Sequence, residues 1–282
     1  MITLKYINTK NQMLILGEDP GFQLIDLQGI HPPKASFSTS TLAGFDGSRI
    51  NTTIVNPRNI VLTIQLSGDI ESNKLRLYDV FKLKREGTLI YTSPILQIQI
   101  EAVVESVEVL PMSWPIKAVI SLLCPQPYFE DLQDNVVDVA AIQPALSFPL
   151  ELFSSGVEIG IIQPSEAQNI VNPGDIPVGM TIRFQAIGTV VKPKIINTQT
   201  LESLELDLIL QAGDVVTITT ERGKKRIELN RSGVITNQFN SLVLGSTFLQ
   251  LDEGDNVLFT TSVSGSSFLM TQILFRPRYV GA

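Results

Sequence analysis

The sequence predicts a mainly β-protein, with an N-terminal β-sandwich or barrel-like domain that carries one helix and a C-terminal β-sandwich. Most apolar runs alternate with polar residues at a period of two, which is typical of half-buried strands. Turn residues such as Asp46-Gly47 and Ala212-Gly213-Asp214 separate these runs. The length of 282 residues leaves room for two domains.

Strands are predicted most clearly in the first half of the chain. Residues 60–66, 96–102 and 116–122 each place apolar side chains on one parity and polar side chains on the other. A period of two turns one set toward a core and the other toward solvent. Cys124 continues the apolar parity of the third run, so we expect a buried thiol.

One segment, Asn73–Arg85, has a helical composition, because Val80 is its only β-branched residue. Ser72 is the expected N-terminal cap, and Gly87 lies just past the expected end. The side chains expected to face the core are Leu77, Tyr78 and Phe81. Five basic residues in the segment are interpreted as a solvated face: Lys74, Arg76, Lys82, Lys84 and Arg85.

Composition sets the domain limits that we expect. Residues 1–130 form the N-terminal domain, in which residues 29–53 are rich in Ser, Thr, Pro and Gly and predict an extended arm or long hairpin. Residues 131–147 read as a connector rich in Pro and acidic residues. Residues 148–282 contain seven expected short strands, the first at Thr181–Val191, with no helical run between them.

Charge and cysteine content exclude several classes of function. The chain has 21 Lys and Arg against 28 Asp and Glu, and neither half is basic, so we expect no nucleic-acid partner. It has one Cys and one His, which excludes an internal disulfide and a Cys/His zinc site. We find no run of about 18 apolar residues and no secretory signal, so no membrane segment is expected.

No residue is predicted to be catalytic, to bind a cofactor or to bind a metal. His31 lies beside Pro32 and Pro33 and is interpreted as an ordinary loop residue. Cys124 has no cationic residue next to it in the sequence, as a reactive thiol would need. Arg58 precedes a predicted strand, and we expect a salt bridge or turn contact rather than a ligand role.

The carboxylates of the chain suggest a weakly supported alternative function, that of a glycosidase. Glu101, Glu105 and Glu108 are close in sequence, and a glycosidase needs two carboxyl groups. The first two lie on the polar parity of a strand, where solvated charge is expected. The acidic run Asp252–Asp255 lacks the spaced oxygen ligands of a calcium loop, so a β-turn is the preferred interpretation.

Sugar binding is a second alternative. A β-sandwich without enzyme motifs could be a carbohydrate-binding module, and such sites present Trp and Tyr. The only Trp, Trp114, lies in the first half, and the second half has one Tyr, Tyr279. A cell-wall sugar is therefore a disfavoured partner.

The order of several motifs resembles the distal tail proteins of siphophages. In the first half the motifs are Val55–Ile60, Gln65–Glu71, Leu77–Phe81, Val104–Glu108 and Ile120–Phe129. In the second half they are Asn172–Gly179, Asn197–Thr200, Ala212–Asp214 and Phe275–Gly281. The resemblance covers nearly the whole chain, and it is carried by the order and spacing of the motifs together.

The resemblance implies a structural protein of the virion tail tip that is made in the host cytoplasm and has no enzymatic activity or cofactor. Members of this family form a ring, usually of six copies, through the N-terminal domain, and the C-terminal domain is a galectin-like β-sandwich. The implied partners are other copies of the chain, the tail tube protein, and a tail-tip lysin or fibre protein. We further expect the arm at residues 29–53 to reach a neighbouring subunit. A monomeric carbohydrate-binding module and a hydrolase using Glu101 or Glu105 remain as alternatives.

Overall fold

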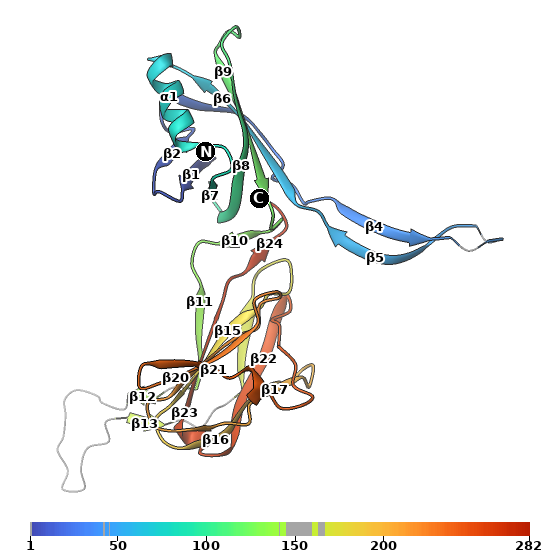
Figure 1. Cartoon of the computed structure of the whole chain (residues 1–282), viewed down its shortest axis with the longest axis vertical. Coiled ribbons are helices and arrows are strands. Elements are labelled where there is room, and N and C mark those ends of the chain that lie inside the picture. The colour runs from blue at the N-terminus through green and yellow to red at the C-terminus, as the bar shows by residue number, and fades with distance from the viewer. Residues whose placement is uncertain (1, 42, 45, 141, 145–159, 163–166) are drawn as a thin grey trace. The chain divides into compact units, whose positions relative to one another are not determined.

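The computed structural model describes residues 2–41, 43–44, 46–140, 142–144, 160–162 and 167–282. These residues are mostly strands, with one α-helix, and they divide into two compact units (Figure 1). The first unit comprises Met1–Leu132 and Arg278–Ala282, and the second comprises Gln133–Pro277. The chain therefore passes between the units twice. None of the helices in these described ranges is long and apolar enough to span a membrane.

The first unit is built on a nine-stranded antiparallel sheet. Seven strands follow the order β2-β1-β7-β8-β9-β6-β3, and β10 pairs with both β8 and β24. The strands are β1 (Thr3–Asn8), β2 (Met13–Leu16), β3 (Phe22–Gln28), β6 (Arg58–Leu66), β7 (Glu86–Thr92), β8 (Gln97–Leu110), β9 (Lys117–Cys124), β10 (Phe129–Asp131) and β24 (Arg278–Tyr279). Two further strands, β4 (Ala35–Ser40) and β5 (Arg49–Val55), form a separate ladder.

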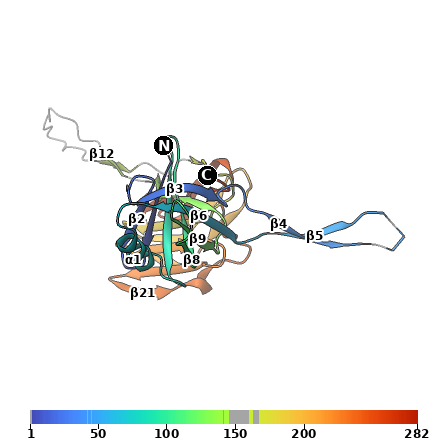
Figure 2. The same ribbon diagram turned by 90° about the horizontal axis from the view of Figure 1, so that it is seen from above.

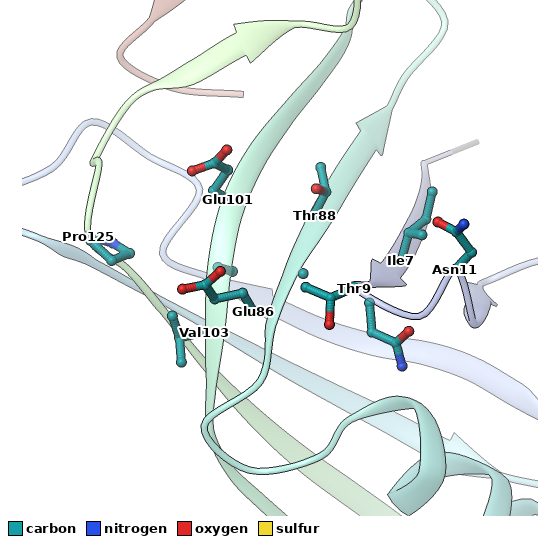
Figure 3. A pocket seen from close by; sticks show the side chains of 11 residues that line it. Ile7, Thr9, Asn11, Glu86, Thr88, Glu101, Val103 and Pro125 are labelled. Carbon is teal, nitrogen blue, oxygen red and sulfur yellow. The ribbon is translucent and has the colours of Figure 1, made fainter. Parts of the chain in front are cut away.

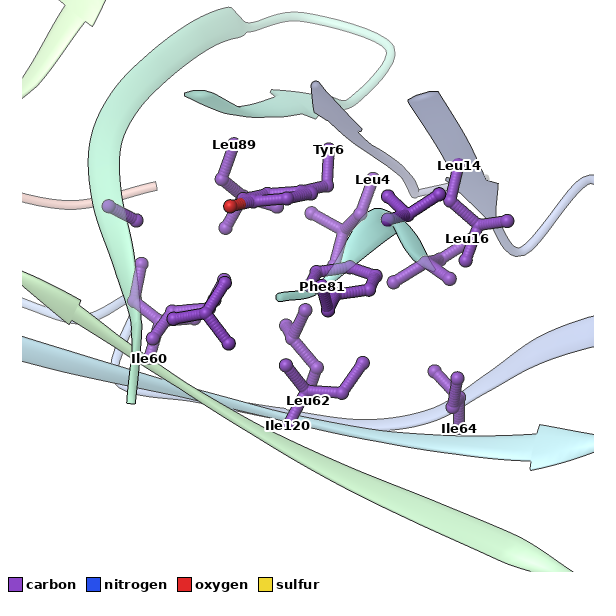
Figure 4. Packing of buried hydrophobic residues seen from close by; sticks show 14 of the residues in the cluster. Leu4, Tyr6, Leu14, Leu16, Ile60, Leu62, Ile64, Phe81, Leu89 and Ile120 are labelled. Carbon is purple, nitrogen blue, oxygen red and sulfur yellow. The ribbon is translucent and has the colours of Figure 1, made fainter. Parts of the chain in front are cut away.

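The core of this unit lies between two parts of the same sheet. Leu4 and Leu14, from β1 and β2, lie across the core from Leu62 and Ile120, from β6 and β9, and Phe81 fills the space between them (Figure 4). The predicted alternation is confirmed, because the apolar parity of β6, β8 and β9 is buried almost throughout. Each strand thus supplies one apolar face to the sandwich.

The helix differs from its prediction at both ends. It is α1 (Ile70–Val80), so it starts three residues earlier than expected and stops before the basic residues that follow. Its N-cap is Asp69, whose carboxylate accepts a hydrogen bond from the backbone N–H of Ser72, the expected cap. Leu77 is buried as predicted, whereas Tyr78 is partly exposed, because it lies one position away from the buried stripe.

The second unit is a β-sandwich of two main sheets. One has the order β11-β23-β15-β19-β20-β21 and the other β14-β22-β16-β17, with β18 beside β16. The strands are β11 (Asn135–Ala140), β14 (Gln168–Asn172), β15 (Met180–Ala186), β16 (Val190–Asn197), β17 (Ser203–Glu205), β18 (Ile209–Leu210), β19 (Val215–Thr219), β20 (Arg226–Arg231), β21 (Val234–Asn237), β22 (Gly254–Ser264) and β23 (Leu269–Phe275). A small ladder joins β12 (Ile142–Pro144) to β13 (Gly160–Ile162), and two 3₁₀ turns, η1 (Phe239–Ser241) and η2 (Ser266–Phe268), complete the unit.

Two details of the second unit differ from expectation. The expected strand Thr181–Val191 is two strands in different sheets, β15 and β16, which are separated at Gly188. A Cβ at Gly188 would lie 2.7 Å from the ring of Phe268, so the chain turns there against that ring. Within the expected connector 131–147, Asn135–Ala140 pairs with β23 as β11. The connector residues 145–147 and the expected domain start at residue 148 lie outside the described residues.

Candidate functional site: an exposed arm and its anchor

The most prominent surface feature is the ladder of β4 and β5, which we call the arm. Among the described residues, each of its strands pairs only with the other, and it stands clear of the sheet of its own unit in both views (Figures 1 and 2). Its residues are exposed, apart from the half-buried Val55. An isolated two-stranded hairpin is marginally stable in water. The arm therefore has the properties of a segment that another surface covers.

Apolar side chains occur on both faces of the arm. Phe37 lies opposite Thr53, and Ile54 lies opposite Ser36, so the two apolar residues face opposite sides of the ribbon. They are 58% and 62% exposed. The two strands contain one charged residue, Arg49. A surface that binds the arm would bury apolar and hydroxyl groups with little charge.

Arg58 anchors the root of the arm. Its guanidinium donates hydrogen bonds to the carbonyls of Gly29 and Ile30, at 3.0 and 2.9 Å, and to the carbonyl of Pro127 at 2.9 Å. It also donates to the carbonyl of Val280. The residue is 3% exposed, and burial lowers the pKa of its guanidinium. One side chain thus joins the arm root, the chain after β9 and the C-terminal segment.

Other contacts at the arm root bring backbone segments close together. The Arg58 guanidinium lies 4.7 Å from the ring centroid of Phe129. Gly29 has φ +82°, and a Cβ there would lie 2.0 Å from the carbonyl oxygen of Asn59, so only glycine fits. The N–H of Ala282 donates to the carbonyl of Ile30 at 3.1 Å. The last residues of the chain therefore belong to the arm root.

The one His and the one Cys of the chain lie in different environments. His31 lies on an exposed loop at the arm root. Cys124 is fully buried at the end of β9, as expected, and burial raises the pKa of its thiol to about 12. A neutral buried thiol is a poor nucleophile.

The candidate carboxylates lie on the outer face of β8. The Glu105 carboxylate accepts hydrogen bonds from Asn59 Nδ2 and Ser121 Oγ, both at 2.7 Å, so it ties β8 to β6 and β9. Glu101 and Glu108 are exposed on the same strand. The structure thus gives Glu105 a bracing role.

Glu101 also lines a hollow of about 310 Å³ beside β7 (Figure 3). The carboxylate of Glu86 lies on the same side, and Thr9, Asn11 and Pro125 contribute to the wall. No His, Cys, Lys or Arg is among its described lining residues. Within the described part of the chain, no three His, Cys, Asp or Glu side chains cluster as metal ligands would.

Several motifs that carry the family resemblance are braced turns in the second unit. Buried Asn172 accepts a hydrogen bond from the N–H of Gly174 and donates to the carbonyls of Ile176 and Leu251. Buried Asp214 accepts from the N–H of Gln211 at 2.8 Å and pairs with Arg231, which lowers the Asp214 pKa. These polar side chains satisfy backbone groups of turns, so the motifs preserve loop geometry.

The acidic run of the second unit forms the bend that leads into β22, and its last residue, Asp255, pairs with Val171 of β14. Gly254 there has φ +80°, and the Asp252 N–H donates to Asn256 Oδ1 at 2.9 Å. The Asp255 carboxylate accepts from Asn169 Nδ2 at 2.7 Å.

Two features of the structure were not predicted from the sequence. The Arg58 partners lie up to 222 residues away, beyond the reach of any local pattern. Of the expected salt bridge or turn contact, the structure shows contacts with backbone carbonyls. The second feature is the turn between β8 and β9, where Trp114 is exposed. A Met and a Trp between Pro111 and Pro115 were the available signal.

The comparisons with known proteins agree with this description. Residues 173–279 match the family described as siphovirus-type tail component, C-terminal domain. No curated protein sequence matches the chain. The Dit (gp 19.1) protein of phage SPP1, described as a paradigm of the hub adsorption apparatus in phages that infect Gram-positive bacteria, aligns with TM-score 0.69 and 14% identity over 99% of both chains.

Two structures of the phage P2 baseplate in its activated conformation, with Ca and with Sr, align over the full length of both chains. Their TM-scores are both 0.52, at 9% and 8% identity. At this identity the structural likeness establishes the fold. The predicted mainly β fold class and the family resemblance are both confirmed: residues 173–279 match the C-terminal domain of siphovirus-type tail components, and the whole chain has the fold of the SPP1 Dit protein.

Proposed function

We propose that this chain is a structural hub component of a phage tail tip, and that six copies form a ring joining the tail tube to the tail-tip apparatus. The observation that best supports a ring is the exposed arm. It is exposed on both faces, and its own unit supplies no strand or core to cover it in the described residues. At about 3.4 Å per residue, its strands of six and seven residues reach about 20 Å.

The arm suits a head-to-tail contact between identical subunits. In a closed ring each copy uses one surface to contact the next copy and a different surface to receive the previous one. An arm anchored by Arg58 fits the first role, because its root is fixed while its strands are free. Phe37 and Ile54 then become buried in the neighbouring subunit.

The two units take different roles in this proposal. The N-terminal domain, residues 1–130, makes the ring, and the C-terminal β-sandwich projects outward from it. The partners are the tail tube protein on one side and a tail-tip lysin or fibre protein on the other. The protein is made in the host cytoplasm and functions in the virion tail. It acts by shape and catalyses no reaction.

The test is the mass of the purified particle. Six copies of a 31.0 kDa chain give about 186 kDa by light scattering, and negative-stain images should show rings. The double variant Phe37→Ser/Ile54→Ser should give single subunits with an unchanged melting temperature, because neither side chain joins a core. The control Leu244→Ser, at an exposed site in the second unit, should keep the ring.

Two results would contradict this proposal. One is a wild-type chain that stays monomeric even with the phage's own tail tubes. The other is an arm double variant that forms the same ring as the wild type.

One observation favours the sugar-binding alternative. A hollow of about 350 Å³ on the outer face of β15, β19 and β20 is lined by polar side chains, including Arg183, Glu228 and Asn230. These groups could bind hydroxyls, but the described residues that line the hollow include no aromatic side chain to stack on a sugar ring. Glycan binding that is lost in Arg183→Ala would support this function.

A further inference from the structure

The segment between β4 and β5 contains the only Asp-Gly pair of the chain, Asp46-Gly47. The chain has no Asn-Gly pair, and every other Asp is followed by a residue that carries a side chain. Pairing in the arm ends at Ser40 and Arg49, so Asp46 and Gly47 lie beyond the last ladder position. Figures 1 and 2 show β4 and β5 running away from the sheet of the first unit, which places this pair at the outer end of the arm.

Neither residue of the pair is covered by the described part of the chain. Both are exposed, and neither forms a hydrogen bond or an ion pair with another described residue. Gly47 has φ +96°, and no described atom lies within 4 Å of the position that a Cβ would take there. Glycine adopts this conformation without steric cost, and it has no side chain to shield its nitrogen. The Gly47 nitrogen is therefore open to the carboxyl group that precedes it.

Other aspartates of the chain are held in place. Asp79 lies inside α1 and pairs with Lys82 at 2.9 Å. Asp214 is 2% exposed and pairs with Arg231. Regular structure and burial limit the local motion that brings a carboxyl group onto the next backbone nitrogen. Asp79 and Asp214 thus serve as two reference aspartates for Asp46.

We propose that Asp46-Gly47 is a site of spontaneous modification, at which the peptide link moves from the main-chain carboxyl group of Asp46 to its side chain. The Gly47 nitrogen attacks Cγ of the protonated side-chain carboxyl group. The N–Cγ bond forms, and the amide proton and the carboxyl hydroxyl leave as water, which gives a cyclic imide.

Hydrolysis of the imide completes the step. When water adds at the main-chain carbonyl carbon of Asp46, the bond from that carbon to the Gly47 nitrogen breaks, the carbon keeps the hydroxyl, and the nitrogen regains a proton. The product is isoaspartate. Addition of water at Cγ restores aspartate instead. One water leaves and one enters, so the mass is unchanged and nothing is oxidised or reduced.

Isoaspartate changes the turn that sets the arm. The backbone gains one carbon, about 1.5 Å of chain, and the former main-chain carboxyl group becomes a free carboxylate. Loop length and geometry fix the register of a hairpin, and a two-stranded ladder has little stability with which to resist the change. This consequence rests on the proposed ring: a subunit that is modified before assembly presents Phe37 and Ile54 on an altered arm and assembles less well.

The experiment incubates the full-length arm variant Phe37→Ser/Ile54→Ser, which is expected to remain as single subunits, at pH 6 for several weeks. Peptide mapping by chromatography and mass spectrometry detects isoaspartate as a peptide of unchanged mass and altered retention, and electron-transfer fragmentation locates it. Position 46 should convert within about threefold of the rate of a synthetic peptide of residues 41–52. The two reference aspartates should convert at least about tenfold more slowly.

The wild type and Asp46→Glu test the effect on assembly. Asp46→Glu keeps the charge, but its imide would need a six-membered ring, which forms far more slowly. After incubation, wild-type rings should contain at least about twofold less isoaspartate at position 46 than wild-type single subunits, because assembly takes up unmodified chains. Freshly dissociated and reassembled samples should show a loss of ring formation with age in the wild type and none in Asp46→Glu.

The results separate this inference from the proposed function. An arm variant without isoaspartate at position 46, while the peptide converts, overturns the inference and leaves the proposed ring intact. Equal conversion at the two reference aspartates also overturns it, because the reaction then belongs to unfolded chains. Equal isoaspartate in rings and single subunits, or equal loss of ring formation in Asp46→Glu, overturns the effect on assembly. A wild type that forms no ring at any age contradicts the proposed function, whereas isoaspartate at position 46 of that chain still supports the modification site.

Discussion

At the residue scale, a few buried polar side chains fix the course of long backbone segments. Arg58, Asn172, Asn197 and Asp214 are all nearly inaccessible, and each binds backbone groups of a turn or chain end. A buried polar group is costly unless it is hydrogen-bonded. Asn197 binds the turn that follows it, whereas Arg58 and Asn172 also bind distant segments, so these residues hold loops that apolar packing alone leaves undefined.

Tyr6 is an exception to this rule. Its ring is fully buried and stacks on Phe81 at a centroid distance of 4.3 Å, but no described residue within hydrogen-bonding distance pairs with its hydroxyl. Burial raises the pKa of Tyr6 to about 12, although Arg85 opposes the shift. The hydroxyl contributes no hydrogen bond to the core, so its loss at neutral pH should cost little.

We expect Tyr6→Phe to keep the free energy of unfolding within about 1 kcal/mol of the wild type at pH 8. Between pH 10 and 12 the unfolded wild-type chain loses the Tyr6 proton before the folded one does, so its stability falls as pH rises. This part of the loss, up to about 2–3 kcal/mol, should vanish in the variant. Urea unfolding at pH 8 and pH 11 measures the difference, which at pH 11 should be about 1.4 kcal/mol because only half of the interval between the two pKa values has been crossed.

The control for this experiment is Tyr78→Phe on the exposed side of α1, which should leave the alkaline loss unchanged. Cys124 adds a loss of the same sign in both proteins, because burial also raises its pKa to about 12. Equal alkaline losses in Tyr6→Phe and the wild type would contradict the assignment.

At the scale of elements, the sequence and the structure assign different N-cap residues to α1. The sequence favours Ser72, whereas the structure uses Asp69, whose side chain accepts from the Ser72 N–H at 3.3 Å. Asp69→Ala should lower the free energy of unfolding by about 1 kcal/mol, because the cap and its charge at the helix N-terminus are lost. Ser72→Ala should change it by less than about 0.5 kcal/mol. Chemical denaturation of both variants tests this order, and the reverse order would support the cap expected from the sequence.

Period-two patterns made most strands of the first unit predictable, because β6 and β9 bury one parity from end to end. The period-two pattern does not predict the strands correctly where the chain bends. A bulge between Val104 and Ser106 shifts the parity of β8, and the turn at Gly188 divides an apparently continuous run. The helix start was not predicted because Ile70 and Glu71 are compatible both with a helix and with the segment before it. Only the geometry of the Asp69 cap places the boundary.

The candidate site was predictable only in part. Composition marked residues 29–53, and the structure has an exposed ladder there, because alternating Ser, Thr and Ile residues form strands without forming a core. The anchor was not predictable. Its hydrogen bonds join Arg58 to Gly29, Pro127 and Val280, and no local pattern encodes contacts over such separations.

At the scale of the whole molecule, the double passage between units makes the first unit depend on the end of the chain. Glu130 and Arg278 pair in the β10–β24 ladder and form an ion pair at 2.8 Å, and Ala282 binds Ile30. The first unit therefore reaches its full set of contacts only after the second unit has been synthesised. A break after residue 130 would separate the first unit from its last strand.

Removal of residues 278–282 from the full chain should therefore destabilise the first unit alone. The cut deletes β24 and leaves the buried Arg58 guanidinium and the Ile30 carbonyl short of partners, at a cost of about 2 kcal/mol or more. Hydrogen exchange should speed up in β6, β10 and the arm root, while β15 and β19 exchange as in the wild type. Arg58→Met should destabilise the same segments, and combining it with the truncation should cost less than the sum of the two, because both remove the Val280 contact. Wild-type exchange throughout the first unit of the truncated chain would show that its fold is complete without the C-terminal segment.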